Sequence, residues 1–134
     1  MTLLLDTHAA IWLSQGEPMS ADAIEKIDRT RNGSRVLLSA VSVWEISNLI
    51  AKQRVILDWQ LGEWVRRFVK ADGFDSVSLS IPMAIEAAKV PADLRDPADR
   101  FLVATARHLG VPLVTRDSRI LKLAKAGYVQ AVAC

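Results

Sequence analysis

The chain has 134 residues, 51% of them hydrophobic, and a formal net charge of +2, which is typical of one globular core, so we expect a single domain over residues 1–134. Its only cysteine, Cys134, excludes a disulfide framework and a cysteine-rich zinc site and favours a reducing compartment. No apolar run reaches the roughly 18 residues of a membrane span, and no secretory signal pattern is present, so we expect a cytoplasmic protein without a membrane partner.

Short apolar runs alternate along the chain with longer segments of helical period. In chain order we expect a strand at 2–5, helices at 8–14 and 20–31, a strand at 35–39, helices at 41–53 and 63–71, a strand at 77–80, helices at 82–89 and 96–110, a strand at 111–115, a helix at 117–127 and a strand at 128–132. The strands are apolar without a clean period of two, as in sheets that are covered on both faces. The pattern predicts an α/β fold, a three-layer α/β/α sandwich around a mainly parallel sheet.

Four acidic residues lie close to places where a strand meets a helix. Asp6 ends the first expected strand and Asp117 ends the fourth. Glu45 lies one turn into the helix after the second strand, and Asp99 lies in the first turn of the helix before the fourth. Because functional sites of open parallel sheets form at the carboxyl ends of the strands, we expect these four carboxylates to lie close together.

Each of these carboxylates also has a purely structural interpretation. Asp6 and Asp117 could cap the helices that follow them, and Asp99 could face the N-terminal dipole of a helix that Asp96 caps. Glu45 could lie on a solvated stripe of its helix. The helical phase favours the functional interpretation for two of them. Asp99 is in phase with the apolar face of its helix, and Glu45 shares a row with Val41 and Leu49. Glu45 also lies in mid-helix, where it has no capping role.

Carboxylates that converge beside an apolar sheet repel one another, and some must then take up protons. A Mg²⁺ or Mn²⁺ ion removes this conflict, because hard cations bind carboxylate oxygens together with water and phosphate. One or two such ions can activate a water molecule for attack on a phosphodiester. The sequence has no G-x-S-x-G elbow, P-loop or G-x-G-x-x-G motif, so it gives less support to covalent hydrolases and nucleotide-binding proteins.

Four sequence blocks stand in a fixed order along the chain: LLLDTHAAIW, LSAVSVWEIS, DPADRFLVATA and LVTRD. In this order and spacing the chain resembles the VapC-type toxins, ribonucleases of the PIN-domain superfamily from toxin–antitoxin modules. The resemblance implies an endoribonuclease with one or two Mg²⁺ or Mn²⁺ ions. Its catalytic and metal-binding residues would be Asp6, Glu45, Asp99 and Asp117. Asp96 and Thr115 fall on supporting positions, and we expect a supporting role for Thr7 as well.

The resemblance also implies partners for the protein besides its RNA substrate. These are a cognate antitoxin, whose C-terminal segment would cover the site, and a second copy of the chain in a homodimer. Leu94 is a departure, because many relatives carry a histidine two residues before the Asp-Pro pair. This departure leaves the metal centre intact but weakens any transfer of substrate preference.

The four tryptophans permit two interpretations. RNA-binding proteins stack unpaired bases on aromatic rings, but large aromatic side chains more often lie in a core. We expect Trp12 and Trp44 to lie in the core. Trp59 and Trp64 have apolar neighbours, and this group would form a partner surface if it is exposed.

Two other classes of function remain open on the sequence alone. One is an acidic-pocket enzyme for small phosphates, or a receiver-like phospho-acceptor, although such proteins usually pair two acids at one strand end. The other is a non-catalytic RNA- or protein-binding module whose acids are all helix caps. A metal titration separates the second class from an enzyme, and a comparison of RNA with small phosphates as substrate separates the first.

Overall fold

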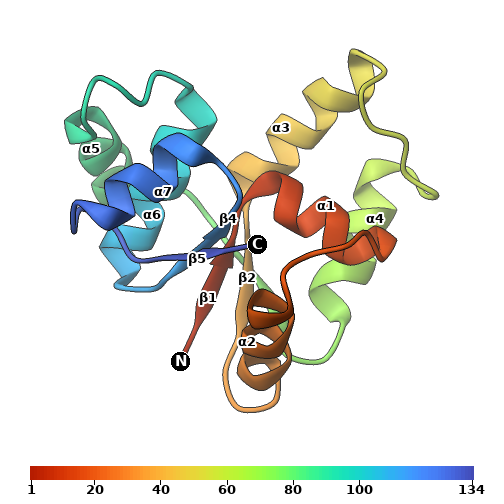
Figure 1. The fold of residues 1–134 in the computed structure, drawn as a ribbon. Coiled ribbons are helices and arrows are strands. Elements are labelled where there is room, and N and C mark those ends of the chain that lie inside the picture. Colours follow the sequence, from red (N-terminus) through yellow and green to blue (C-terminus); the bar gives the residue numbers. More distant parts are fainter.

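The structure is a computed structural model that describes residues 1–134, and its strands form one five-stranded sheet (Figure 1). The strands are β1 (Leu3–Leu5), β2 (Val36–Ser39), β3 (Phe74–Val77), β4 (Leu113–Thr115) and β5 (Ala131–Ala133). They lie in the order β3-β2-β1-β4-β5, and all four neighbouring pairs are parallel. The predicted α/β fold around a parallel sheet is confirmed.

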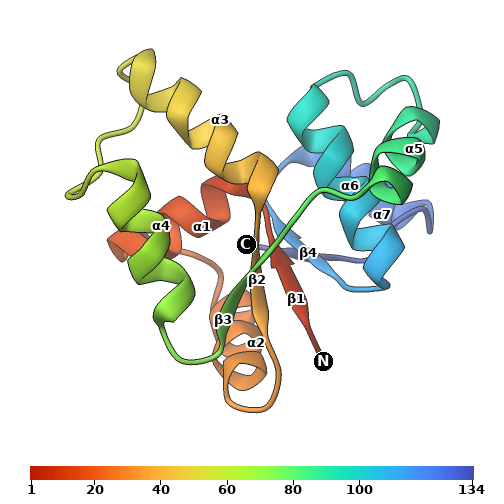
Figure 2. The same ribbon diagram turned by 180° about the vertical axis from the view of Figure 1, so that it is seen from behind.

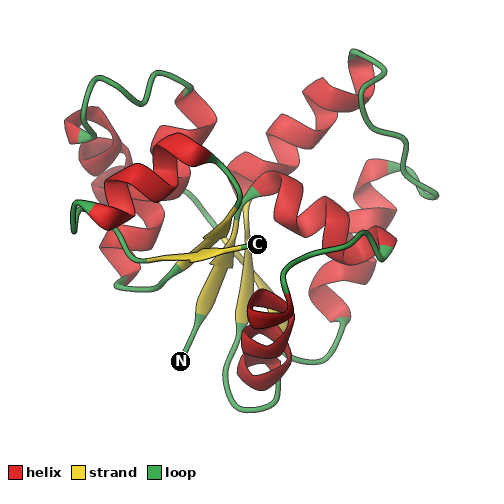
Figure 3. Cartoon of the chain, viewed as in Figure 1, coloured by secondary structure: helices red, strands yellow, loops and turns green.

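Seven helices cover the two faces of the sheet. They are α1 (Thr7–Gln15), α2 (Ala21–Arg31), α3 (Ala40–Ala51), α4 (Leu61–Lys70), α5 (Ile81–Lys89), α6 (Pro97–Leu109) and α7 (Ser118–Lys125). Helices α1, α2 and α4 lie on one side, and α5, α6 and α7 lie on the other, as the view from behind also shows (Figure 2). The helices thus form the outer layers of a three-layer arrangement with the strands between them (Figure 3). None of them combines the length and apolar composition that crossing a bilayer requires.

The central strand β1 explains why three consecutive leucines begin the chain's first element. Leu3 and Leu5 pack into a cluster with α1, α2 and α4, whereas Leu4 packs into a second cluster with α6 and α7. All three side chains are fully buried. Because successive residues of a strand point to opposite faces, a strand with a core on both sides needs apolar residues without alternation.

The order of the strands places a crevice beside β1. From β1 the chain adds β2 and β3 on one side of the sheet and then adds β4 and β5 on the other side. In open parallel sheets, ligands bind outside the carboxyl ends of the strands at the point where this direction reverses. The carboxyl ends of β1 and β4 meet at that point, and α1 and α7 begin directly after them.

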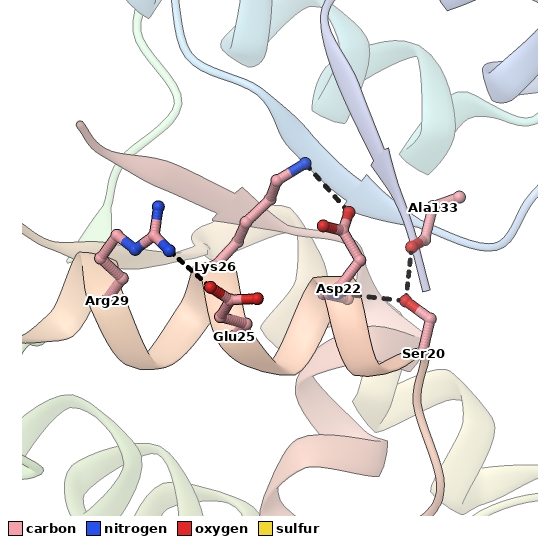
Figure 4. Close-up of polar contacts among 7 residues, drawn as sticks. Ser20, Asp22, Glu25, Lys26, Arg29 and Ala133 are labelled. Atoms are coloured by element: carbon pink, nitrogen blue, oxygen red, sulfur yellow. Dashed lines mark hydrogen bonds and ion pairs between the residues drawn. The ribbon is translucent and has the colours of Figure 1, made fainter.

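Helix α2 is joined to the last strand, β5, through its N-cap residue Ser20 (Figure 4). The Ser20 hydroxyl caps α2 by accepting a hydrogen bond from Ala23 N (3.1 Å), and it donates one to the carbonyl oxygen of Ala133 (2.9 Å). The exposed side of α2 carries the ion pairs Asp22–Lys26 and Glu25–Arg29. Pairs of this i,i+4 kind stabilise a helix only slightly, so the Ser20 contact does more to fix α2 against β5.

Every predicted helix is confirmed within two residues at each end, but the strand predicted at 77–80 is wrong, because β3 spans Phe74–Val77. The two central residues of β3 are polar and exposed at this edge of the sheet, so no apolar run marks the strand. Gly73, directly before it, has φ +85° and lies so close to Arg31 that a Cβ atom would stand 2.2 Å from its carbonyl oxygen. Only glycine fits there.

The strand predicted at 128–132 is displaced in the same way, because β5 spans Ala131–Ala133. Gly127 has φ +85°, and the N–H of Tyr128 donates to the carbonyl oxygen of Leu123 (3.0 Å). This left-handed turn closes the end of α7. Tyr128 is therefore still part of the helix end, and the strand begins later than its apolar residues indicate.

The predictions for the tryptophans need correction. Trp44 is 56% exposed and is not a core residue, and Trp12 is only partly buried. Trp64 is 6% exposed, packs in the core cluster and donates a hydrogen bond from Nε1 to the Ser14 hydroxyl (3.2 Å). Of the predicted partner surface, Trp59 is exposed and Trp64 is not.

Replacing Trp64 by alanine is expected to lower the free energy of unfolding by about 3–5 kcal/mol, because the change leaves a large cavity in the core. The matched change Trp44→Ala removes the same side chain from the surface and should cost about 0.5 kcal/mol or less. Urea denaturation of both variants measures the difference. Equal losses would place Trp64 outside the core.

Candidate active site

A cavity of about 420 Å³ lies at the carboxyl ends of β1 and β4. Five carboxylates line it: Asp6, Glu45, Asp96, Asp99 and Asp117. The four predicted catalytic residues and the predicted supporting residue Asp96 therefore meet in one place, although they come from positions up to 111 residues apart (117 − 6). The prediction that these side chains lie close together is confirmed.

Asp6 follows β1 directly and is only 7% exposed. Two hydrogen bonds hold its carboxylate: Oδ1 accepts from Thr7 N (2.7 Å), and Oδ2 accepts from the Thr115 hydroxyl (2.6 Å). Burial raises the pKa of Asp6, and these two hydrogen bonds partly oppose that rise. The side chain thus has a fixed orientation at the bottom of the cavity.

Thr115 joins the ends of β1 and β4. Its hydroxyl donates to Asp6 and accepts a hydrogen bond from Asp117 N (3.1 Å). Asp117 caps α7, because its Oδ1 accepts from Arg119 N (2.8 Å) and Ile120 N (3.1 Å). The capping role proposed as an alternative for Asp117 is therefore real, and it leaves the second carboxylate oxygen without a hydrogen-bond partner in the protein.

Thr7 joins α1 to the helix that carries Glu45. Its hydroxyl donates to the Ser42 hydroxyl (2.9 Å) in the first turn of α3, and both residues are fully buried. Ser42 stands three residues before Glu45, so this bond fixes the turn of α3 that faces the cavity. Thr7 is predicted as a supporting residue, but Ser42 is not. The position of Ser42, one helical turn before Glu45, could have indicated that it lies near the site.

Glu45, Asp96 and Asp99 form the closest group of carboxylates. Each of them offers one oxygen that lies within 4.8 Å of the other two. Asp96 also caps α6, since its Oδ1 accepts a hydrogen bond from Asp99 N (3.0 Å). The sequence predicts a supporting role for Asp96, but in the structure one of its oxygens lies as near to Glu45 and Asp99 as a shared metal ligand would.

The electrostatics of this group are unfavourable without a cation. Burial is the main reason why the pKa of Asp99 rises from 3.8 to about 8, and the negative charges of Asp6, Asp96, Asp117 and Glu45 raise it further. Burial likewise raises the pKa of Glu45. None of the five carboxylates takes part in an ion pair. An all-oxygen donor set with this excess of negative charge fits a hard divalent cation.

Comparison with known proteins places this arrangement in a family. The family model described as PIN domain matches residues 3–126. The chain belongs to the PIN-domain family. Ribonuclease VapC22 of Mycobacterium tuberculosis is a relative, 31% identical over 121 residues, which are 89% of this chain and 89% of that protein. The predicted resemblance to the VapC-type ribonucleases is thus confirmed.

Solved structures support the same PIN fold. VapBC2 from Rickettsia felis, bound to a DNA fragment from its promoter, superposes with a TM-score of 0.73 at 12% identity and covers 99% of this chain and 98% of its own. DNA-bound VapBC from Salmonella typhimurium gives 0.71 at 16% identity, with coverage of 99% and 98%. At such low identities these similarities show the fold alone.

This PIN domain carries further side chains around its acidic cavity that the sequence analysis did not identify. They are His8, Trp12, Arg116 and Arg119. Trp12 stands four residues after His8 on α1, a spacing that puts two side chains on one helix face, and the two rings lie 5.7 Å apart. Leu94 does not reach the cavity, because it is 1% exposed and lies in the core cluster beneath α6.

Arg116 is held in place on the wall of the cavity. Its guanidinium donates to the carbonyl oxygens of Cys134 (3.0 Å) and Pro18 (3.0 Å) and lies 3.9 Å from the centre of the Trp12 ring. These contacts join α1, the C-terminal residue and the loop before α2. Arg116 therefore fixes the wall that Trp12 forms and does not neutralise the carboxylates through an ion pair.

Proposed function

We propose that this PIN domain, comprising residues 1–134, is a metal-dependent endoribonuclease that acts as the toxin of a toxin–antitoxin pair. The observation that carries the proposal is the convergence of five carboxylates at the reversal point of the sheet, where none of them takes part in an ion pair. The 31% identity to a protein named as a ribonuclease supports the reaction. RNA would be met in the cytoplasm, where we place the protein.

The residues present fit a Mg²⁺ or Mn²⁺ ion, or two. Glu45, Asp96 and Asp99 would hold the first ion, because their oxygens already lie within 4.8 Å of one another. Asp6 and Asp117 line the same cavity and complete the set of ligands we propose. When bound, such an ion lowers the pKa of a water molecule and neutralises charge on a phosphodiester.

The remaining catalytic contributions come from the way the chain fixes its own carboxylates. Thr115 and the Thr7 N–H hold Asp6, and the Thr7–Ser42 bond holds the turn of α3 below Glu45. Fixed carboxylates need no reorganisation when charge develops on the reacting phosphate, which is a main source of catalytic power in enzymes. We therefore assign catalytic and metal-binding roles to Asp6, Glu45, Asp99 and Asp117, and supporting roles to Thr7, Thr115 and, as an additional ligand, Asp96.

Purified protein with Mn²⁺ is expected to cut an RNA internally and to leave phosphate monoesters intact. The reason is that the cavity at the carboxyl ends of β1 and β4 is open, which gives a polymer access to the carboxylates. Gel analysis of end-labelled RNA and a phosphate-release assay separate the two activities. Release of phosphate from a monoester without RNA cleavage would favour the small-phosphate enzyme, and neither activity would favour the binding module.

The change Glu45→Gln tests the metal centre without measuring catalysis. It keeps the shape of the side chain and removes one of the repelling charges, so the metal-free variant should melt at a higher temperature than the wild type. Added Mn²⁺ should then raise the melting temperature of the wild type more than that of the variant, because the variant has one ligand fewer. Differential scanning calorimetry in EDTA and in Mn²⁺ measures both shifts.

The control for this test is Glu25→Gln on the exposed side of α2, where Glu25 pairs only with Arg29. This variant should show the full wild-type response to Mn²⁺. An equal response in Glu45→Gln would remove Glu45 from the metal centre.

We also propose an antitoxin partner and a homodimer. The solved structures of similar fold from Rickettsia felis and Salmonella typhimurium are VapBC structures, which supports a protein partner for this chain. A groove of about 800 Å³ between α3 and α4 is lined by the exposed side chains of Ile50, Ile56 and Trp59. We assign the antitoxin to this groove, which contains Trp59 of the predicted partner surface but not the buried Trp64.

A further inference from the structure

A second cavity, of about 340 Å³, adjoins the acidic cavity and shares His8 and Trp12 with it. Its chemistry is different, because five of its nine lining residues are hydrophobic. The volume lies in the range of cavities that bind small molecules or parts of larger ligands. The two cavities together form one continuous surface that changes from carboxylates on one side of Trp12 to an apolar wall on the other.

The apolar wall is fixed by contacts within the chain. Gln15 Nε2 donates to the carbonyl oxygen of Ile56 (2.8 Å) and so fastens the segment after α3 to α1. At the end of α3, Gln53 has φ +58°, and Arg54 N donates to the carbonyl oxygen of Leu49 (2.9 Å). This backbone conformation is uncommon for a residue other than glycine. The turn that carries Arg54 is thus fastened to the last turn of α3 by a backbone hydrogen bond.

Two arginines with free guanidinium groups line this surface, one in each cavity. Arg119 lines the acidic cavity and Arg54 lines the second cavity, and neither side chain makes a hydrogen bond or an ion pair within the protein. Arg116, in contrast, is used by the carbonyl oxygens of Cys134 and Pro18. Glu17 also faces the second cavity, without pairing with Arg54. One free cationic group thus lies in the acidic cavity with the carboxylates, and the other lies in the second cavity.

We propose that the second cavity binds the nucleotide next to the scissile phosphate of a single-stranded RNA. The base and ribose pack against Trp12 and the apolar wall, the neighbouring phosphate binds Arg54, and Arg119 binds the backbone on the other side of the carboxylates. Single-stranded RNA fits because only an unpaired base can turn out of a stack into a protein cavity. The assignment rests on the proposed ribonuclease function and names the residues that position its substrate.

The phosphate contacts are tested with a fluorescent single-stranded RNA of mixed sequence, whose binding is followed by anisotropy at several salt concentrations. Ca²⁺ is present to occupy the carboxylates, and a gel checks that the RNA stays intact. Each phosphate contact that is lost should reduce the slope of log K against log salt by about 0.7 for a single strand. We expect this reduction for Arg54→Ala and for Arg119→Ala.

The matched control is Arg35→Ala, which removes the same charge at the amino end of β2. This end of the strands is opposite to the carboxyl ends at which the cavities lie. The Arg35→Ala variant should keep the wild-type slope. If Arg54→Ala and Arg35→Ala have equal affinities and slopes, or if the wild type does not bind the RNA, the assignment is overturned.

The base contact is tested with a strand that has the same phosphates but no bases. The wild type should prefer the base-bearing strand by about tenfold, the scale of one stacked base, and Trp12→Leu should reduce this preference. An undiminished preference in a folded Trp12→Leu variant would overturn the base assignment. If the Arg54→Ala variant cleaves RNA as well as the wild type does, the subsite is contradicted but the ribonuclease function is not. If RNA binding depends on Arg54 but no cleavage occurs in Mn²⁺, only the ribonuclease function is contradicted.

Discussion

Asp99→Asn is expected to lower the rate of RNA cleavage by about a thousandfold or more, the scale on which loss of one preorganised group acts on an enzyme. Asp99 is the most strongly perturbed carboxylate of the cavity, with a pKa of about 8, and it faces four other acidic side chains. Its carboxylate accepts no hydrogen bond from the protein, so asparagine keeps the shape of the side chain without breaking an internal contact. The loss should therefore come from the chemistry of the cavity and not from unfolding.

Asp93→Asn provides the control for this variant. Asp93 is an exposed aspartate in the loop before α6 and does not line the cavity. The Asp93→Asn variant should cleave RNA at the wild-type rate. Circular dichroism should show that both variants are folded. Cleavage by Asp99→Asn within a few-fold of the wild type would contradict the role of Asp99.

The metal-free protein is expected to lose stability as the pH rises from about 4 to about 8. The folded protein holds a proton on Asp99 with a pKa of about 8, whereas an ordinary aspartate has a pKa of 3.8. Between these values the folded state binds more protons than the unfolded state, and stability then falls with increasing pH. The raised pKa values of Asp6 and Glu45 act in the same direction.

Urea denaturation in EDTA across this pH range measures the slope. Asp99→Asn should show a flatter profile, because its side chain carries no titratable proton. Mn²⁺ should stabilise the wild type most at the upper end of the range, where the carboxylates are most fully ionised. A profile that is flat in EDTA, or equally steep in Asp99→Asn, would contradict the raised pKa of Asp99 that burial and the neighbouring carboxylates produce.

The parts of the molecule that follow from local rules could be predicted from the sequence. Leu3–Leu5 identifies a strand with a core on both faces, and Asp6 and Asp117 stand at strand ends that a parallel sheet brings to one edge. For Asp117, capping and a place in the cavity are compatible, because the cap uses only one of its two carboxylate oxygens. The helix starts at Ser20 and Asp96 could be predicted for the same reason, since a cap depends on residues within one turn.

The parts that depend on packing between distant segments could not be predicted. Trp44 lies on α3, whose apolar residues surround the helix almost completely, so the phase does not show which side faces the core. The wall that Arg116 builds needs carbonyl groups of Pro18, 98 residues away, and of Cys134. The closeness of Asp96 to Glu45 depends on how α6 packs beside α3. The edge strand β3 has no apolar signal because solvent covers part of it.

The removal and return of metal tests the central claim most directly, which is that these carboxylates cleave RNA by holding a divalent cation. Protein dialysed against EDTA is incubated with an end-labelled RNA, first in chelator and then with Mn²⁺ in excess, beside Asp99→Asn and Asp93→Asn. The wild type and Asp93→Asn should be silent in EDTA and should cut the RNA at internal positions once Mn²⁺ is added, while Asp99→Asn stays silent throughout. Undiminished cleavage by the wild type in chelator, or no cleavage after Mn²⁺ is restored, would contradict the claim.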